Sequence, residues 1–301
     1  MMKMKSKIIL IVGPTATGKT KLSIALAHHF DAEILNTDSC AMYKEPLIGT
    51  AKVTDEEMDG IKHHLVSNVS LNDEYTIFDF QKDGRKVIDD LISKGKNIVI
   101  VGGSGLYVKA LLYNYELLET ETKRVDYSKY TNEELKKTAD DIDPNNGIHT
   151  NNRHRLERYI TFYNETGSTI KKTPNINKKV YDFVTIGLKS SREEMYDRIN
   201  KRVDEMFDIG LLDEAKNLYS KHYGNLDNII GYKELIPYFE NKTSLEEAKD
   251  EIKKDTRHLA KRQMTFYNHQ FDDIKWFDVN YNNFNETIQK IIEYLDWYSI
   301  F

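Results

Sequence analysis

The sequence is poor in cysteine, in long apolar runs and in excess positive charge. A single cysteine, Cys40, excludes an internal disulfide framework and a cysteine-based metal cluster. No apolar run approaches the roughly 20 residues that span a bilayer, and the run at residues 8–12 is too short for a signal-peptide core. A net charge of −5 leaves nucleic-acid binding to local basic patches. We therefore expect a cytoplasmic protein without a membrane segment.

What the sequence does contain is a complete phosphate-binding loop near its start. The G-x-x-x-x-G-K-[ST] pattern is formed by Gly13, Pro14, Thr15, Ala16, Thr17, Gly18, Lys19 and Thr20. A buried-strand pattern precedes it and an amphipathic helix pattern follows at residues 21–30. Backbone N–H groups of such a loop bind an oxyanion, Lys19 supplies a mobile charge, and Thr20 offers a hydroxyl to Mg²⁺. The pattern is typical of ATP sites, but it does not identify the phosphate compound.

The first third of the chain alternates predicted strands and helices. After the loop come a strand at 32–37, a helix at 78–92 and a buried strand at 97–101. This order predicts an α/β fold, a P-loop core with a parallel sheet flanked by helices. Ligands of such sheets bind outside the carboxyl ends of the strands. The phosphate loop, Asp38 and the glycine-rich segment 102–105 each follow a predicted strand, so we expect them to converge on one crevice.

The composition changes at about residue 115. Residues 116–180 are polar and charge-rich, with helical patterns around 132–140 and 151–163 and no buried strand, which predicts an all-helical insertion domain. The pattern at 184–188 predicts a return to the sheet. Helices at 191–207 and 245–269, a short strand at 276–279 and a terminal helix are expected after it. The predicted core therefore comprises residues 1–115 and 181–301.

Two predicted strand ends carry groups suited to catalysis beside a phosphate. Asp38 could bind Mg²⁺ or accept a proton from an incoming nucleophile, or it could merely cap a turn. Segment 102–105 presents Ser104 at the sheet edge, and no aspartate ends that strand, which argues against a motor-type or switch-type ATPase. His63 and His64 are adjacent and point in different directions, so we expect structural roles and no metal-binding pair.

Two basic helical segments, 153–158 and 257–263, lie close to aromatic residues such as Tyr159 and Phe266. This combination suits a folded RNA, in which cations contact phosphates and aromatic rings stack on bases. A solvated charged helix face is the alternative, and the pattern alone does not decide between them.

Taken together, these segments resemble the tRNA dimethylallyltransferase family along nearly the whole chain. The resemblance is carried by segments 13–20, 38–44, 48–52, 63–65, 101–107, 154–158, 231–232 and 259–263. An Ile-Gly-Thr-Ala-Lys segment after Asp-Ser, combined with Lys-Arg-Gln near the end, is far more restrictive than the phosphate loop. The resemblance implies transfer of a dimethylallyl group from dimethylallyl diphosphate to N6 of an adenosine. That adenosine is 3′-adjacent to the anticodon, at position 37, in tRNAs reading codons that start with U.

The resemblance also implies a role for each matching residue. The phosphate loop would hold the diphosphate leaving group, with Lys19, Thr20 and Mg²⁺ neutralising the developing charge. Asp38 matches the family's general base, which takes the proton of the attacking amine. Ser104 matches a position that usually carries threonine, whose hydroxyl bonds the oxygen bridging carbon and diphosphate.

The residues implied to bind the anticodon stem-loop of tRNA are Asp38, Ser39, Cys40, Ala41, Ser104, Arg124, His154, Arg155, Leu156, Glu157 and Arg158. The chain departs from the family at Asn228, where many members carry an arginine that helps hold the diphosphate, and at Phe266, where the family has tryptophan. We expect Lys233 or an arginine of the insertion to supply the missing charge, and we expect a monomer. The alternatives are a small-molecule P-loop kinase, a transferase acting on free adenine nucleotides, and a non-catalytic RNA-binding module.

Overall fold

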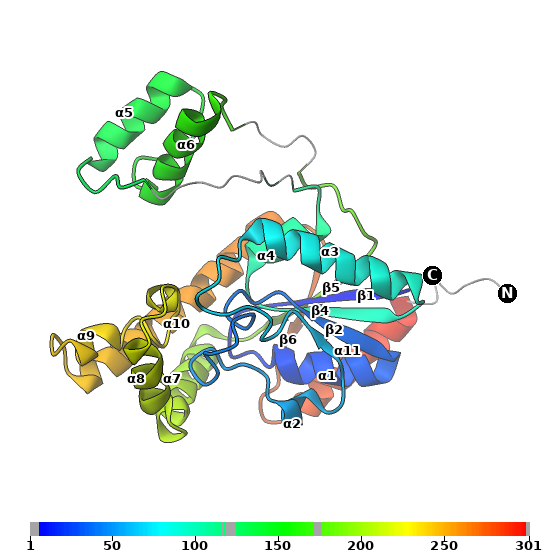
Figure 1. Ribbon diagram of the computed structural model, residues 1–301. Helices are drawn as coiled ribbons and strands as arrows, with labels where there is room; N and C mark the ends of the chain where they lie inside the picture. Colours follow the sequence, from blue (N-terminus) through cyan, green and yellow to red (C-terminus); the bar gives the residue numbers. More distant parts are fainter. Residues whose placement is uncertain (1–5, 116, 118–124, 171–175, 299–301) are drawn as a thin grey trace. The chain divides into compact units, whose positions relative to one another are not determined.

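A single parallel sheet forms the centre of the larger of two compact units (Figure 1). The computed structural model describes residues 6–115, 117, 125–170 and 176–298. The sheet order is β3-β2-β4-β1-β5-β6, and all its pairs are parallel. The strands are β1 (Ile8–Val12), β2 (Ala32–Asn36), β3 (His63–His64), β4 (Asn97–Val101), β5 (Val184–Lys189) and β6 (Ile274–Asp278). The parallel α/β fold predicted from the sequence is confirmed.

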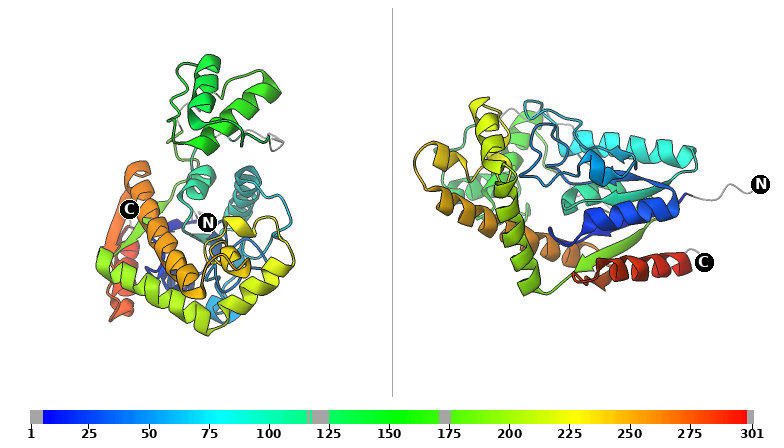
Figure 2. Two further views of the ribbon diagram at one scale, coloured as in Figure 1. Left: turned by 90° about the vertical axis from the view of Figure 1, so that its left-hand side faces the viewer. Right: turned by 90° about the horizontal axis from the view of Figure 1, so that it is seen from below.

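Alternate residues of the strands face two different helical layers. In β1, Leu10 packs in one core cluster with α3 (Ile77–Ser93) and α4 (Gly105–Leu112), whereas Ile11 packs in the other with α1 (Lys19–Phe30) and α11 (Phe284–Tyr298). Figures 1 and 2 show these two helix pairs on opposite faces of the sheet. Both faces of the strands are thus covered, which explains why they read as continuous apolar runs.

A third group of helices lies beyond the carboxyl ends of the strands (Figure 1). It consists of α7 (Arg192–Asp208), α8 (Leu211–Ser220), the turn η1 (Leu226–Asn228), α9 (Ile236–Phe239) and α10 (Leu245–Gln270). Its own apolar cluster joins α7, α8 and α10 through Val203, Ala215 and Ile252. A short helix, α2 (Asp55–Met58), begins with a capping box at Thr54. These helices border the sheet edge at which ligands of α/β proteins bind.

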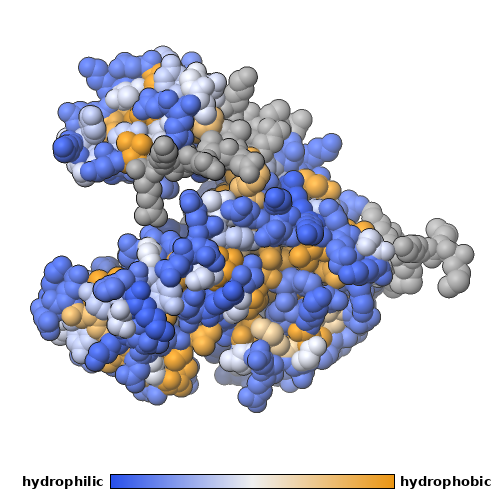
Figure 3. All heavy atoms as spheres, viewed as in Figure 1, coloured by the Kyte–Doolittle hydropathy of each residue, from blue (hydrophilic) through white to orange (hydrophobic). Residues whose placement is uncertain are grey.

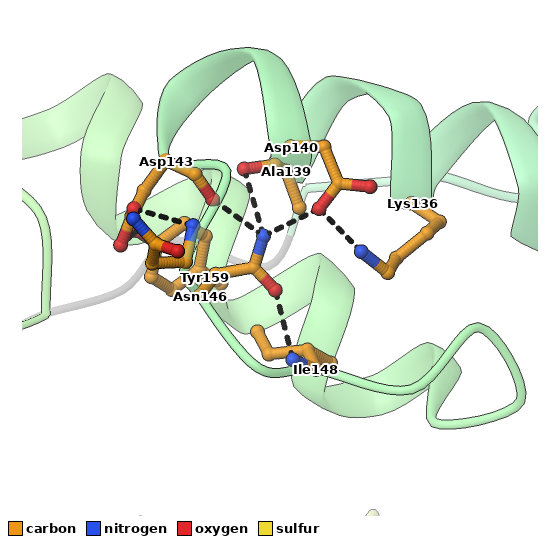
Figure 4. A network of polar contacts seen from close by, with 8 residues as sticks. Lys136, Ala139, Asp140, Asp143, Asn146, Ile148 and Tyr159 are labelled. Atoms are coloured by element: carbon orange, nitrogen blue, oxygen red, sulfur yellow. Dashed lines mark hydrogen bonds and ion pairs between the residues drawn. The ribbon is translucent and has the colours of Figure 1, made fainter.

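The second compact unit comprises Asn114–Lys178, where the sequence predicts residues 116–180. Its described elements are α5 (Asn132–Ile142) and α6 (Arg153–Thr166), which pack through Leu135, Ala139 and Leu156. The connection between the helices is organised by Asn146 (Figure 4). Its side-chain amide donates to Asp140 Oδ1 and Asp143 O, and its Oδ1 accepts from the N–H of Ile148.

The adjacent histidines form β3, which the sequence does not predict. His63 and His64 pair in register with Ile34 and Leu35 of β2. The ring of His64 contacts Glu33 Oε2 at 2.7 Å, and that of His63 contacts the carbonyl of Ile61 at 2.9 Å. Both rings therefore have protein partners.

The surface drawn in Figure 3 is mostly hydrophilic, with apolar residues scattered among the charged ones. None of the helices in the described ranges is long and apolar enough to cross a membrane. Within the same ranges, no cluster of three or more His, Cys, Asp or Glu side chains could hold a metal ion.

Candidate active site

Three strand ends meet at one edge of the sheet because β4 lies between β1 and β2. The phosphate loop follows β1, Asp38 follows β2, and segment 102–105 follows β4. The N–H of Thr37 donates to the carbonyl of Val101 at 2.8 Å, and a Cβ on Gly102 would lie only 2.6 Å from the backbone nitrogen of Asp38. Glycine at position 102 is therefore needed for the two loops to approach each other.

The phosphate loop has the backbone geometry of an anion site. Gly13 (φ +145°) and Gly18 (φ +87°) take conformations that side chains disfavour, and α1 begins directly after Gly18. The hydroxyl of Thr17 and the ammonium of Lys19 both donate to the carbonyl of Pro14 at 2.8 Å. The loop thus directs the N-terminus of α1, the positive end of its dipole, towards a cavity.

That cavity, here called the polar chamber, has a volume of about 610 Å³. Its lining contains the exposed hydroxyl of Thr20 and six cationic side chains: Lys19, Lys21, Lys52, Arg198, Lys201 and Arg202. Burial lowers the pKa of Lys19 to about 8, with the Asp38 carboxylate acting in the opposite direction. Such a concentration of positive charge in a partly desolvated cavity suits a multiply charged phosphate compound.

Two arginines of the polar chamber were not singled out from the sequence. Arg198 and Arg202 lie one turn apart on α7, so they share a face. Arg198 Nε donates to the carbonyl of Ala16 in the phosphate loop at 3.2 Å, and its guanidinium lies 4.1 Å from the ring centre of Tyr281. Burial lowers the pKa of Arg202, while the carboxylates of Glu57 and Asp38 oppose that shift. In the sequence, their i, i+4 spacing indicates only that both arginines lie on one face of a helix. It does not indicate that this face packs against the phosphate loop.

Asp38 lies on the wall between the polar chamber and a second cavity. Its N–H donates to Asn36 Oδ1 at 2.9 Å, and the amide of Asn36 donates back to its carbonyl and to that of Leu65. Asp38 Oδ1 accepts the N–H of Cys40 at 2.9 Å. A Cβ on Gly103 would lie 3.3 Å from Asp38 Oδ2. The carboxylate is thus fixed through one oxygen and directs the other towards segment 102–105.

Ser104 connects that segment to the Asp38 loop. It stands at the N-cap of α4 without bonding the helix through its side chain. Instead, its Oγ accepts the N–H of Ser39 at 3.1 Å and lies 3.1 Å from Ser39 Oγ. Ser104 also lines the second cavity.

The second cavity, here called the apolar chamber, measures about 540 Å³. Its apolar lining side chains include Leu106, Tyr107, Ile199, Val203, Met206, Ile229 and Phe266. Polar and charged side chains also line it, among them Ser39, Ser104, Asn228, Lys233, Arg262 and Gln263. The two chambers share wall residues, among them Lys19, Asp38 and Arg202. A charged ligand in one chamber and a flatter, less polar one in the other would therefore meet at Asp38.

Gln263 of α10 ties the two reactive loops together. Its Oε1 accepts the N–H of Thr15 at 2.8 Å, and its Nε2 donates to the carbonyl of Gly103 at 3.0 Å. The side chain is 7% exposed, so both bonds lie largely out of water. The sequence marks Gln263 only as part of the Lys-Arg-Gln segment, because no local pattern indicates a bond to a loop 248 residues away.

Lys233 lines the apolar chamber and forms ion pairs with two acidic side chains. Its ammonium lies 2.6 Å from Asp255 and 3.5 Å from Glu234. Asn228 lines the apolar chamber and donates to Asp227 Oδ1 at 3.0 Å. Arg198 and Arg202 of α7 are further cations, and they line the polar chamber. The role of Lys233, or of an arginine of the insertion, in supplying the missing charge stays a prediction.

In the second unit, α6 carries the basic segment predicted to contact tRNA. His154, Arg155 and Arg158 are exposed, and Glu157 pairs with Arg153 at 2.7 Å. Leu156 is fully buried in the core of the unit. Its side chain therefore packs between α5 and α6 and is not exposed to a ligand, so a tRNA contact at this position would involve the backbone. Arg124 lies outside the described residues.

The parallel sheet, the phosphate loop after β1 and the cation-lined chamber define a P-loop α/β protein. Residues 41–270 match the family described as IPP transferase, and the chain belongs to this family. The tRNA dimethylallyltransferase of Macrococcus caseolyticus is 39% identical over 301 residues, which cover 96% of this chain and 95% of the relative. That of Enterococcus faecalis is 40% identical over 281 residues, covering 90% and 91%.

Solved structures give the same assignment. A tRNA delta(2)-isopentenylpyrophosphate transferase from Staphylococcus epidermidis superimposes with a TM-score of 0.73 at 34% identity, covering 97% of this chain and 99% of that one. A eukaryotic dimethylallyltransferase acting on tRNA gives 0.80 at 28% identity, covering 98% and 80%.

Proposed function

We propose that this chain transfers a dimethylallyl group from dimethylallyl diphosphate to N6 of the adenosine at position 37 of tRNAs reading codons that start with U. Dimethylallyl transfer to tRNA follows from membership of the family. The relatives named tRNA dimethylallyltransferase match this chain over almost their whole length. The observation that carries the assignment of a diphosphate donor and an amine acceptor is the wall shared by the chambers, because it brings a candidate base beside an intact phosphate loop. Position 37 and the codon class rest on the resemblance to the family.

The polar chamber suits the diphosphate. Backbone N–H groups of the loop, Lys19 and the two α7 arginines would bind its oxygens and stabilise the charge that grows as the C–O bond breaks. Thr20 offers a hydroxyl in the same chamber. Mg²⁺ favours one or two protein oxygens completed by phosphate oxygens and water, so this donor set fits it. When bound, the ion would neutralise further charge on the leaving group.

The apolar chamber suits the acceptor adenine and the allyl chain. The base must leave its stack to enter, at a cost of roughly a few kcal/mol. The N6 lone pair forms the new C–N bond while the electron pair of the C–O bond leaves with the diphosphate. Asp38 takes the N6 proton, and the Ser104 hydroxyl donates to the bridging oxygen. Gln263 fixes the phosphate loop and segment 102–105 relative to each other, which would keep the leaving group and the Ser104 hydroxyl in a reactive geometry.

The exposed cations of α6 suit the phosphates of the anticodon stem-loop. Arg155 and Arg158 are three residues apart on one face of the helix.

A transfer assay tests the proposal. The protein is incubated with dimethylallyl diphosphate labelled in the allyl group, Mg²⁺ and either unmodified tRNA or AMP. Label is expected in tRNA and not in AMP. Label in AMP alone would make free nucleotides the substrate, and no transfer to either would favour a kinase or a binding module.

A further inference from the structure

A short loop without helix or strand, residues 47–52, forms one wall of both chambers. Thr50 and Ala51 line both cavities, and Lys52 lines the polar chamber. Ala51 has a positive φ of +48°, a conformation that non-glycine residues adopt at some cost. Lys52 folds back and donates to the carbonyls of Tyr43 and Lys44. Within the loop, the N–H groups of Ala51 and Lys52 donate to the carbonyls of Ile48 and Leu47. These bonds close the turn, whereas the position of the turn relative to the chambers depends on contacts outside the loop.

The carboxylate of Glu214, on α8, provides that hold. It accepts three consecutive backbone N–H groups of the loop, those of Leu47 (3.1 Å), Ile48 (3.0 Å) and Gly49 (3.3 Å). It also accepts the hydroxyl of Tyr232. Hydrogen bonds to an ionised acceptor are stronger than neutral ones, so a single carboxylate fixes the start of the loop.

Tyr232 fixes the same point from the other side. Its hydroxyl accepts the N–H of Gly49 at 3.0 Å, and its ring is 1% exposed. A Cβ on Gly49 would lie 2.5 to 2.9 Å from atoms of that ring and hydroxyl, so only glycine allows this contact. The neighbouring Gly231 (φ +98°) packs on Gly49, and its N–H donates to Glu234 Oε2 at 2.8 Å.

We propose that Glu214 and Tyr232 are positioning residues that set the affinity for dimethylallyl diphosphate by holding loop 47–52 against the polar chamber. Neither residue is among those lining the two chambers, so they act through the loop. Asp38 is held by Asn36, and the phosphate loop by Gln263. The reacting groups therefore keep their geometry when the loop is loosened. The inference rests on the proposed function for the identity of the diphosphate ester.

The test compares Glu214→Gln, Tyr232→Phe and the double variant in steady-state transfer to tRNA. Glutamine places an NH₂ group against N–H donors, and phenylalanine keeps the ring but removes the hydroxyl. Each single variant is expected to raise KM for dimethylallyl diphosphate about tenfold, the size of one or two lost charge-assisted hydrogen bonds. kcat is expected to stay within about threefold. The double variant should resemble the singles, because contacting residues of one network are not additive.

Asp213→Asn is the matched control, since Asp213 is the exposed acidic neighbour on the same turn of α8. It should leave KM unchanged. Unchanged KM in folded Glu214→Gln and Tyr232→Phe would overturn the proposal, as would a fall in kcat at constant KM or additive effects in the double variant. Thermal unfolding monitors folding, and Tyr232→Phe keeps the test valid if Glu214→Gln fails to fold.

Calorimetric titration with inorganic diphosphate separates this proposal from the acceptor assignment. If wild-type protein binds diphosphate but modifies no tRNA, only the proposed acceptor is wrong. Weaker diphosphate binding by the variants would still support the role of Glu214 and Tyr232 in holding loop 47–52. Equal binding by wild type and variants would contradict it.

Discussion

At the residue scale, the proposed chemistry depends on a few side chains that line the wall shared by the two chambers. Asp38 is held by a hydrogen bond to one oxygen and by Asn36 at its backbone, so its second oxygen is presented in a fixed direction. The cations of the polar chamber come from other parts of the chain, Lys19 and Lys21 from α1 and Arg198, Lys201 and Arg202 from α7. The base and the anion site are therefore built from separate elements and can be tested separately.

Asp38→Asn should remove the base and keep the acceptor that holds the Cys40 N–H. We expect kcat to fall by about 10² to 10⁴, while the Kd for tRNA changes little because the exposed cations of α6 remain. Single-turnover transfer and filter binding measure the two effects. Turnover close to wild type would refute the assignment of the base.

Arg202→Gln should raise KM for dimethylallyl diphosphate by about tenfold or more, because one buried charge-assisted contact to phosphate is lost. Arg192→Gln is the matched control, as Arg192 is an exposed arginine in the first turn of the same helix. Equal KM values for the two variants would show that α7 does not bind the diphosphate.

At the element scale, α10 organises the site. Gln263 bridges the two reactive loops, Phe266 covers Gly105, and Asp255 near its centre binds Lys233. Next to Lys233 in the chain is a buried carboxyl, Glu234, which accepts the N–H of Gly231. Contacts of α10 thus hold the reactive loops in place and also stabilise the helices beyond the sheet.

Glu234→Gln should flatten the pH dependence of stability. Burial raises the pKa of Glu234 from 4.5 to about 7, with Lys233 acting in the opposite direction. At pH values between these two pKa values, Glu234 is deprotonated in the unfolded chain and protonated in the folded chain. The free energy of unfolding therefore falls as the pH rises through this range, by up to about 3 kcal/mol. Urea unfolding near pH 5 and near pH 8 measures the change.

The exposed Glu246 provides the control for that measurement. Glu246→Gln should leave the difference between the two pH values as in wild type. A Glu234→Gln variant with the same pH dependence as wild type would contradict the buried-acid account.

The elements that the sequence predicts are those with a long or continuous pattern. The five-residue apolar strands and long helices such as α7 and α10 lie within a few residues of their predicted bounds. The sequence does not predict β3, which has two residues, or α9, which has four. Segments this short show no measurable periodicity of apolar residues. For the site, the phosphate loop, Asp38 and Ser104 follow strands and could be located. Arg202, Gln263 and Glu214 could not, because helix packing alone brings them to the loops.

At the scale of the whole molecule, the two compact units divide the work proposed here. The larger unit contains both chambers, and the smaller one presents an exposed basic helix face. Chemistry and part of the tRNA affinity should therefore respond to different substitutions.

The double variant Arg155→Gln/Arg158→Gln should weaken tRNA binding about tenfold. The slope of log K against the logarithm of salt concentration should become shallower by roughly 1 to 2, since each cation neutralises at most one phosphate. KM for dimethylallyl diphosphate should not change. Lys129→Gln/Lys137→Gln removes the same charge from exposed positions of the same unit. Equal losses in both double variants would indicate only a general charge effect.

The most direct test of the central claim is the stoichiometry of diphosphate release and dimethylallyl transfer. Two tRNA transcripts that differ only in adenosine or guanosine at position 37 are incubated with the protein, Mg²⁺ and dimethylallyl diphosphate. The account predicts one diphosphate released for each dimethylallyl group found on N6 of that adenosine, and neither product with the guanosine transcript. Equal transfer to both transcripts, or diphosphate release without transfer, would contradict it.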